Sequence, residues 1–243
     1  MRRSLRKSLP VRAALAALCA GLFLAALPAA AEPAHVLIRQ PLDAPTPAGY
    51  AAQLGGWRNG GGAFEVILLQ GQPDSAKPGF ASLAILDFPD EAAYERWQRT
   101  EAPKLDKSLV VRRADVMAHS ETGSRKPDSA VFILNQYEAL VSRSAAQDYT
   151  DQYTIPKLSG QTTAGILKRY TAYLEREPEG THPQIVLVME YADQGAFARR
   201  EEVKAPHKKR LQENFPVWKR VAEDKASVRI DRNETRAKLQ PLP

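Results

Sequence analysis

Four histidines are the residues best suited to acid–base chemistry, because an imidazole ring gains or loses a proton near neutral pH. They are His35, His119, His182 and His207. No two of them are spaced as a local metal-binding motif requires, so no metal site is predicted. His207 follows Ala205-Pro206 and could act as a general base. The basic residues 208–210 that come next indicate, alternatively, an exposed charged face.

His119 is the second candidate catalytic residue. It lies just beyond a strand expected at 109–116, where its ring could point inward or into water. Asp87 and Glu190 end two equivalent apolar runs and could approach each other as a proton-transfer pair. In the alternative interpretation, each acid acts locally near the start of the following helix.

Aromatic side chains form the second group with chemical potential. They are Trp97, Tyr137, Tyr149, Tyr153, Tyr170, Tyr173 and Trp218. Such residues could line a pocket for a flat organic ligand, although aromatics at strand and helix periods are also typical of a core. Tyr170 and Tyr173 must face opposite sides of one strand, whereas Arg169 shares the side of Tyr173. The candidate ligand-binding residues are Tyr137, Arg169, Tyr173 and Trp218.

An internal repeat organises the chain that must position these residues. Residues 83–97 (LAILDFPDEAAYERW) and 186–200 (VLVMEYADQGAFARR) share an apolar run, an acid with an aromatic, an aspartate and a helical stretch. Asp90 and Asp193 are predicted to cap the two helices. The repeat indicates a duplicated domain.

Hydrophobic periodicity gives both halves the order β-α-β-β-α-β. The expected first-half elements are strands at 35–40, 64–70, 81–88 and 109–116, with helices at 46–57 and 91–107. The expected second-half strands are at 131–140, 167–175, 185–191 and 228–232; one helix begins at Ser144, and a long helical region after Asp193 is broken at Pro206 and Pro216. The predicted fold is α+β, with two tandem ferredoxin-like repeats at 32–120 and 130–243, joined by a linker at 121–129. Their sheets are expected to pack together as one intramolecular α/β barrel.

The first 31 residues are predicted to be a cleavable signal peptide. Basic residues precede the apolar run 13–27, and Pro28-Ala29-Ala30-Ala31 follows it. The run is too short for a membrane span, so no stable membrane association is expected after cleavage. The N-terminal arginines leave open whether export uses the general secretory or the twin-arginine route. The expected location is periplasmic or secreted.

Removing this segment changes the charge and the cysteine count. Five of the 34 Lys and Arg lie in it, so 29 remain against 28 Asp and Glu, and a nucleic-acid partner is not expected. Cys19, the only cysteine, also lies there, which excludes thiol catalysis in the remainder. The sequence contains no Gly-x-Ser-x-Gly motif, and the glycine-rich run 55–62 precedes a strand, unlike a phosphate-binding loop.

The sequence resembles the dimeric α/β-barrel superfamily, which includes antibiotic-biosynthesis-monooxygenase-like, EthD-like and NIPSNAP-like domains. The residues that carry the resemblance are Asp148-Tyr149, Tyr153, residues 156–158, Ile166-Leu167 and residues 186–197. The resemblance implies a barrel, here built by one chain, but it does not specify an activity. Members include cofactor-free oxygenases, haem enzymes and ligand sensors. His207 or His119 would then be the base or the axial haem ligand, although no cofactor is predicted.

The expected function is binding of a small apolar or aromatic molecule between sheet and helices, in the second half of the chain. One alternative is a cofactor-independent monooxygenase-like or haem-handling enzyme. Another is a structural or interaction protein without a cavity of about 300 Å³ or more, the usual lower size of small-molecule sites. Whether the chain is an enzyme stays open, and it is expected to be a monomer or a homodimer.

Overall fold

An eight-stranded antiparallel barrel forms the centre of the protein. The computed structural model describes residues 32–60, 62–123, 127–178 and 181–243, so the expected signal peptide lies outside the described residues. The strands are β1 (Ala34–Gln40), β2 (Glu65–Gly71), β3 (Ser82–Phe88), β4 (Val110–Glu121), β5 (Val131–Ala139), β6 (Leu167–Glu175), β7 (Gln184–Tyr191) and β8 (Arg229–Gln240). They close in the order β1-β3-β2-β8-β5-β7-β6-β4. The expected α+β barrel is therefore confirmed.

The two halves of the chain contribute four strands each. The first half has the order β4-β1-β3-β2 and the second β8-β5-β7-β6, so corresponding strands take corresponding places. The halves join along both edges, through β2 with β8 and β4 with β6. Closure leaves no exposed sheet edge, and it encloses the sheet faces that helices do not cover.

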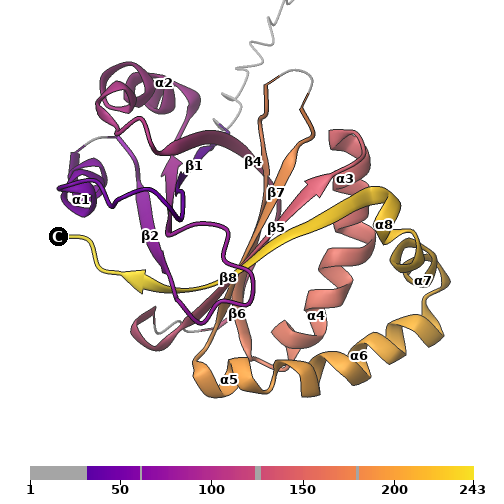
Figure 1. Cartoon of the computed structure of the whole chain (residues 1–243). Coiled ribbons are helices and arrows are strands. Elements are labelled where there is room, and N and C mark those ends of the chain that lie inside the picture. Colours follow the sequence, from indigo (N-terminus) through magenta and orange to yellow (C-terminus); the bar gives the residue numbers. More distant parts are fainter. Residues whose placement is uncertain (1–31, 61, 124–126, 179–180) are drawn as a thin grey trace, which may run out of the picture. The chain divides into compact units, whose positions relative to one another are not determined.

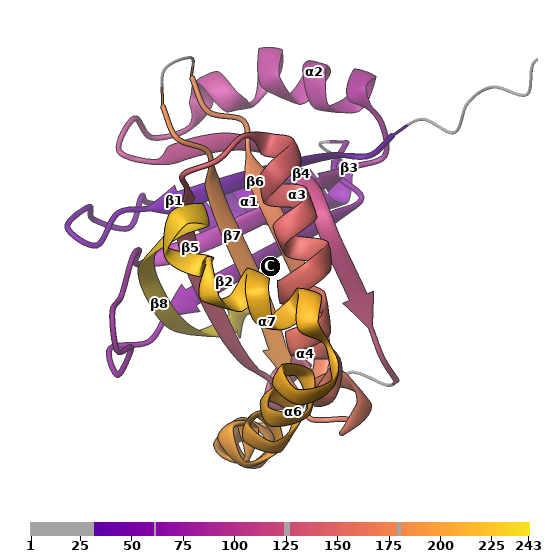
Figure 2. The same cartoon turned by 90° about the vertical axis from the view of Figure 1, so that its right-hand side faces the viewer.

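Helices lie outside the barrel on two sides, with α1 and α2 opposite α3, α4 and α7 (Figures 1 and 2). The helices are α1 (Tyr50–Gly60), α2 (Glu91–Thr100), α3 (Arg143–Tyr149), α4 (Ile155–Thr163), α5 (Gln194–Ala198), α6 (Arg200–Asn214), α7 (Pro216–Glu223) and α8 (Lys225–Val228). A π-helical turn at Thr150–Thr154 joins α3 to α4. The carboxylates of Asp90 and Asp193 each accept a hydrogen bond of 2.7 Å from the backbone N–H three residues later, as predicted.

Several expected element boundaries are wrong, including that of the helix expected at 91–107, which ends at Thr100. Pro206 does not break the helical region but lies inside α6, whereas α7 does begin at Pro216. Proline costs α6 one backbone hydrogen bond, and packing of α6 against α4 compensates for that loss. Strand β8 continues to Gln240 because it hydrogen-bonds to β5 and then β2, and β4 continues to Glu121 through its pairing with β6. His119 therefore lies within β4.

The interior of the barrel is filled by apolar side chains such as Leu37, Phe132 and Val186. Tyr173 belongs to this interior cluster, whereas Tyr170 packs outside against the helical layer, as their spacing predicts. Among the residues that the structure describes, no helix combines the length and apolar character needed to cross a membrane.

The helix-facing side of the first half is also filled. Trp57 and Trp97 pack edge to face with ring centroids 5.4 Å apart, and Phe88 lies 5.5 Å from Trp97. These rings occupy the space between the first-half sheet and α1 and α2. The corresponding space in the second half is not filled to the same extent, and it holds the candidate site.

Candidate functional site

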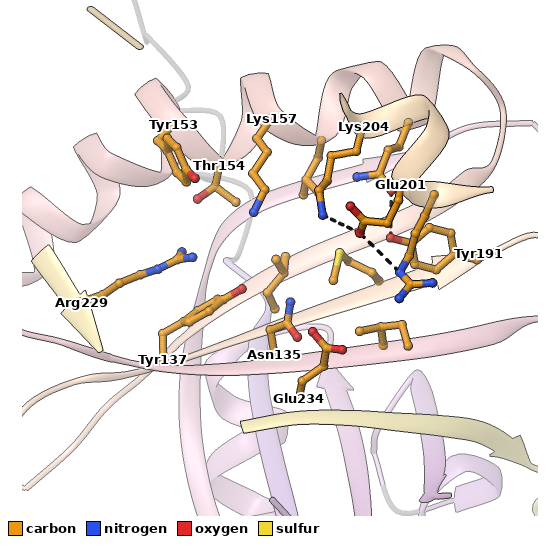
Figure 3. Close-up of a pocket in the computed structure, with 16 residues that line it drawn as sticks. Asn135, Tyr137, Tyr153, Thr154, Lys157, Tyr191, Glu201, Lys204, Arg229 and Glu234 are labelled. Atoms are coloured by element: carbon orange, nitrogen blue, oxygen red, sulfur yellow. Dashed lines mark hydrogen bonds and ion pairs between the residues drawn. The ribbon is translucent and has the colours of Figure 1, made fainter. Parts of the chain in front are cut away.

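A cavity of about 280 Å³ lies between the outer face of the second-half sheet and helices α4 and α6 (Figure 3). Its volume is close to the lower end of the range for small-molecule sites. Alternation along β5 and β7 supplies the sheet side of the cavity, because residues two apart share one face. The apolar and aromatic lining residues are Ile133, Tyr137, Tyr153, Leu158, Leu187, Met189 and Tyr191.

Lys157 of α4 enters this cavity from the helical side, with its ammonium group directed into the space (Figure 3). The pKa of Lys157 is lowered to about 8, mainly by burial and also by the positive charges of Arg229, Lys204 and Lys225, while Asp231 opposes them. Removing water from an ammonium group disfavours its charged form, and nearby cations add to this effect. The site therefore holds a lysine that titrates close to physiological pH.

Arg229, the first residue of β8, is held in a cage of tyrosine rings. Its guanidinium carbon lies 3.6 Å from the ring centroid of Tyr137, 5.3 Å from that of Tyr149 and 6.0 Å from that of Tyr153. Its Nε atom is 3.2 Å from Oδ1 of Asp231. Aromatic faces attract a cation most strongly where water is excluded, and the side chain of Arg229 is only 5% exposed. A second fixed positive charge therefore lies next to Lys157.

Trp218 supports this cage from behind and does not line the cavity. Its ring stacks on Tyr153 with centroids 5.1 Å apart, and its indole N–H donates a 3.1 Å hydrogen bond to the carbonyl of Tyr153. Of the four predicted ligand-binding residues, Tyr137 alone lines the cavity.

Polar groups complete the lining. The hydroxyl of Tyr191 donates a 2.9 Å hydrogen bond to Oε1 of Gln161, and burial raises the pKa of Tyr191 and of Tyr137, so both stay protonated. The buried amide oxygen Oδ1 of Asn135 has no hydrogen-bond partner among the described residues. A buried acceptor of this kind is costly unless a ligand or water satisfies it. The cavity therefore offers the phenol hydroxyl of Tyr137 as a donor and the amide oxygen of Asn135 as an acceptor.

Positive charge exceeds negative charge around the cavity. The charged lining residues are Lys157, Arg200, Glu201, Lys204, Arg229 and Glu234. Glu201 is shared, since Oε1 is 2.6 Å from Nζ of Lys204 and 3.8 Å from Nε of Arg200. Its carboxylate lies toward the α6 side, away from Arg229 (Figure 3). This distribution favours an organic anion with an apolar, flat part.

His207 lies outside this cavity, although it was predicted as a base. Its Nε2 atom donates a 2.7 Å hydrogen bond to the carbonyl of Pro156, and Nδ1 accepts one of 2.9 Å from Arg210. Both ring nitrogens are thus engaged. The ring packs against α4, where a Cβ atom added to Gly160 would lie 2.4 Å from Cγ of His207.

The Gly160→Ala protein is therefore expected to be less stable by about 1–2 kcal/mol, because the overpacking at His207 exceeds the gain in helix propensity. Gly56→Ala is the matched control, since a Cβ atom there meets nothing within 4 Å and is expected to add up to about 1 kcal/mol. Urea unfolding of both variants measures these changes. Equal stabilisation of the two proteins would show that His207 does not pack on Gly160.

Arg169 and Tyr173 lie on the interior face of the barrel, whereas His119 is an exposed residue near the end of β4. Nδ1 of His119 is 3.0 Å from the hydroxyl of Thr171, on the side of β6 that carries Tyr173. Arg169 does share the face of Tyr173, but its guanidinium lies 3.4 Å from Glu190 and 3.6 Å from Glu65 across the barrel. None of the three candidates lines the cavity.

The two acids at equivalent strand ends have separate partners. Oδ1 of Asp87 is 2.6 Å from Nδ1 of His35, while Glu190 lies beside Arg169. Among the described residues, no group of histidine, cysteine or acidic side chains is placed to hold a metal ion.

Glu175, at the opposite end of the barrel interior from Arg169, is a fully buried acid. Its Oε2 atom accepts a 2.7 Å hydrogen bond from Arg39. Burial nevertheless raises the pKa of Glu175 to about 7; the guanidinium of Arg39 opposes this rise, and Glu177 adds to it. Between pH 4.5 and 7 the Glu175 carboxyl is therefore protonated in the folded protein but ionised in the unfolded chain. The stability that this proton contributes is fully present below pH 4.5 and is lost as pH rises toward 7.

In the Glu175→Gln protein this decline in stability, about 2 kcal/mol between pH 5 and 8, is expected to be absent. Urea unfolding across that pH range measures it. Glu95→Gln is the control, because Glu95 is 54% exposed on α2 and should keep the wild-type pH profile. A profile for Glu175→Gln that matches the wild type would contradict the raised pKa.

The sequence contains a signal for Lys157, although this lysine was not among the predicted site residues. Tyr149, Tyr153 and Lys157 are spaced by four, which places the lysine on the same helical face as two tyrosines. Arg229 had no comparable signal, because the expected strand at 228–232 gave no indication of the face it presents.

Comparison with known proteins supports the fold. No protein-family model matches the sequence, and no curated protein matches it. A crystal structure of a "putative monooxygenase" from Fusobacterium nucleatum has a TM-score of 0.56 at 12% identity, over 88% of this chain and 94% of that one. An "anthrone oxidase-like protein" has a TM-score of 0.54 at 10% identity, over 86% and 91%. A "putative monooxygenase" from Lactobacillus acidophilus NCFM has 0.52 at 12% identity, over 85% and 93%.

These likenesses extend over nearly the whole of each solved chain. They agree with the barrel fold that was expected from the sequence. At such low identity they concern the fold alone.

Proposed function

We propose that this protein binds a small organic anion, with a flat apolar part, in the cavity between β5, β7, β8 and helices α4 and α6. The observation that carries the proposal is the pair of cations, the half-buried Lys157 and the buried Arg229, beside tyrosine rings in a cavity whose charged lining is mainly positive. A carboxylate or phenolate would restore the charge balance, and the aromatic and aliphatic lining would bury a ring. Asn135 could accept a hydrogen bond from a second polar group of the ligand.

The energetics favour this assignment over a filled structural core. A positive charge that loses water without gaining an opposite charge costs free energy, which the lowered pKa of Lys157 expresses. Proteins retain such costs mainly where they serve a function. An anion that binds next to Lys157 would recover part of that cost and raise the pKa of the lysine again.

Cofactor-independent oxygenation is the second candidate function. Two of the structures with the same fold are described as monooxygenases and one as anthrone oxidase-like. The observation that favours it is the position of Lys157 in the cavity beside the ring of Tyr153, where its lowered pKa would suit a base that takes a proton from a phenol. Oxygen consumption upon addition of a polycyclic phenol tests this candidate.

Haem fits this cavity less well. The residues that line the cavity include no histidine, and His207 and His119 are hydrogen-bonded elsewhere in the described chain. A haem-handling role is therefore not part of the proposal.

Calorimetric titration of the purified chain with benzoate, and separately with benzamide, tests anion binding. These probes have nearly the same shape but differ in charge. We expect benzoate to bind at least about tenfold more tightly, the size of one charge-assisted hydrogen bond. Equal affinities, or no binding of any ring carboxylate or phenolate, would overturn the proposal.

Three further features complete the proposed picture. The first 31 residues would direct export to the periplasm or beyond, supported by their basic, apolar and small-residue pattern. The two halves would be tandem ferredoxin-like repeats that arose by duplication, supported by their matching strand orders. A single chain would suffice for the site, as monomer or homodimer, because its own eight strands close the barrel.

A further inference from the structure

Lys157 has an environment suited to covalent chemistry as well as to charge recognition. We propose that Lys157 is a nucleophile that forms an imine with an aldehyde or ketone group of the bound anion. This inference rests on the proposed ligand-binding function. It narrows the ligand class to anionic carbonyl compounds.

The amine of Lys157 is positioned to react with a bound molecule. Its Nζ atom is directed into the cavity, between α4 and the sheet (Figure 3). Within the described part of the chain, Lys157 has no ion pair or side-chain hydrogen bond, and its Nζ atom lies 5.7 Å from the ring centroid of Tyr153. Lys204 and Lys225 differ from it, because carboxylates of Glu201 and Asp231 hold their ammonium groups. Lys157 is thus free to attack a bound molecule.

The neutral amine, which is the form that attacks a carbonyl, is available near neutral pH. Charged and titratable groups surround Lys157 from several elements: Tyr137 on β5, Tyr153 on the π-helical turn, Glu201 and Lys204 on α6, Lys225 on α8, and Arg229, Asp231 and Glu234 on β8. Burial and the excess of cations bring the pKa to about 8. A lysine desolvated next to other cations is a recognised form of activated amine.

Proton donors for the reaction line the same cavity. The neutral amine donates its electron pair to the carbonyl carbon, the C=O π electrons move to oxygen, and a proton passes from nitrogen to that oxygen. Loss of water from this carbinolamine requires a proton on the departing oxygen. Tyr137 can donate it, because its hydroxyl lies in the same space and burial keeps it protonated (Figure 3). Thr154, one helical turn before Lys157, carries a second hydroxyl in the lining.

The balance of this step is simple. One amine and one carbonyl give one imine and one water, the proton taken from Tyr137 returns from the nitrogen, and no oxidant or reductant is consumed. The surrounding positive charge selects a carbonyl compound that also carries a carboxylate or phenolate. The volume of about 280 Å³ suits a molecule built on a single ring.

Reductive trapping tests the proposal. The full chain is incubated with para-carboxybenzaldehyde and cyanoborohydride, and peptide mass spectrometry locates the carboxybenzyl groups that the reduced imine leaves. We expect Lys157 to be labelled at least about tenfold faster than any other lysine near pH 7.5. The label should be lost in Lys157→Arg and kept in Lys209→Arg, since the side chain of Lys209 is 77% exposed.

Benzoate titration of the same preparations separates this proposal from the proposed function. Benzoate binding without preferential labelling of Lys157 overturns the imine and leaves anion binding standing. Absence of both overturns both. Preferential labelling by benzaldehyde as fast as by para-carboxybenzaldehyde supports the nucleophile but contradicts its preference for anions.

Discussion

Benzoate is expected to bind the Lys157→Met protein about 10- to 100-fold more weakly than the wild-type chain, because one charge-assisted hydrogen bond in a desolvated site contributes about 1.5–3 kcal/mol. Methionine keeps the length and most of the volume of the lysine stem, so the shape of the cavity is preserved. Isothermal titration calorimetry near neutral pH measures the change. Lys209→Met is the control, since Lys209 is exposed on α6 and should leave the affinity unchanged.

The pH dependence of the same binding reaction identifies the responsible charge. The pKa of Lys157 is about 8 in the free protein, and a bound anion raises it, so the complex holds more protons than the free protein above pH 8. Affinity is then highest below pH 8 and falls as pH rises through 8. Lys157→Met should remove this fall. Reductive labelling of the wild type should show the opposite trend between pH 6 and 8, because it needs the neutral amine.

In the Lys157→Met protein, the stability is expected to rise while the affinity for benzoate falls. A lysine whose pKa falls from 10.5 to about 8 on folding costs stability at all pH values below 8, and this cost disappears as pH rises toward 10.5. Lys157→Met should therefore raise the free energy of unfolding by about 1–2 kcal/mol at pH 7. Urea unfolding checks this. A variant that loses both stability and affinity would indicate a structural role for Lys157 and would contradict its assignment as a ligand-binding cation.

Much of the barrel could be predicted from the sequence because its signals are local. Alternation of apolar residues marks strands such as β3 and β7, and Asp90 and Asp193 cap helices through contacts within three residues. These signals do not depend on the rest of the fold. The repeated pattern then limited how two groups of four strands could be arranged.

The C-terminal strand shows where local reasoning fails. The sequence of β8 after residue 232 (NETRAKLQ) is rich in charged and polar residues, so no apolar run marks it as a strand. Pairing with both β5 and β2 supplies its backbone hydrogen bonds, and closure of the barrel fixes it. The helix break expected at Pro206 is wrong for the same kind of reason, because contacts between α6 and α4 outweigh the local free-energy cost of the proline.

The candidate site could be predicted only in part. Tyr137 was found because aromatic residues are expected in pockets, and the second half was favoured because of its tyrosines. Lys157 and Arg229 were missed because a lysine or arginine is usually solvated, and only tertiary packing reveals which one is buried. The tryptophans that fill the first half have the same residue types as a pocket lining, so composition alone cannot distinguish a filled space from a cavity.

Arg229→Met is expected to destabilise the protein by about 2–3 kcal/mol, because it removes a buried cation from three tyrosine faces and from Asp231. The loss is below that of a fully buried ion pair, since Asp231 is half exposed and retains Lys225 as a partner. Arg232→Met is the matched control on the same strand. Its ion pair with Glu138 lies at the surface, where such pairs contribute about 1 kcal/mol or less.

Arg229→Lys separates charge from geometry in the same site. A lysine keeps the positive charge but lacks the planar guanidinium that stacks on Tyr137, so it should recover less than half of the stability lost in Arg229→Met. Because the rings of Tyr137 and Tyr153 also line the cavity, loosening the cage should weaken benzoate binding in both variants. Urea unfolding and calorimetry measure the two effects. If Arg229→Met and Arg232→Met had the same small effect on stability, Arg229 could not be the residue that holds the tyrosine wall of the cavity in place.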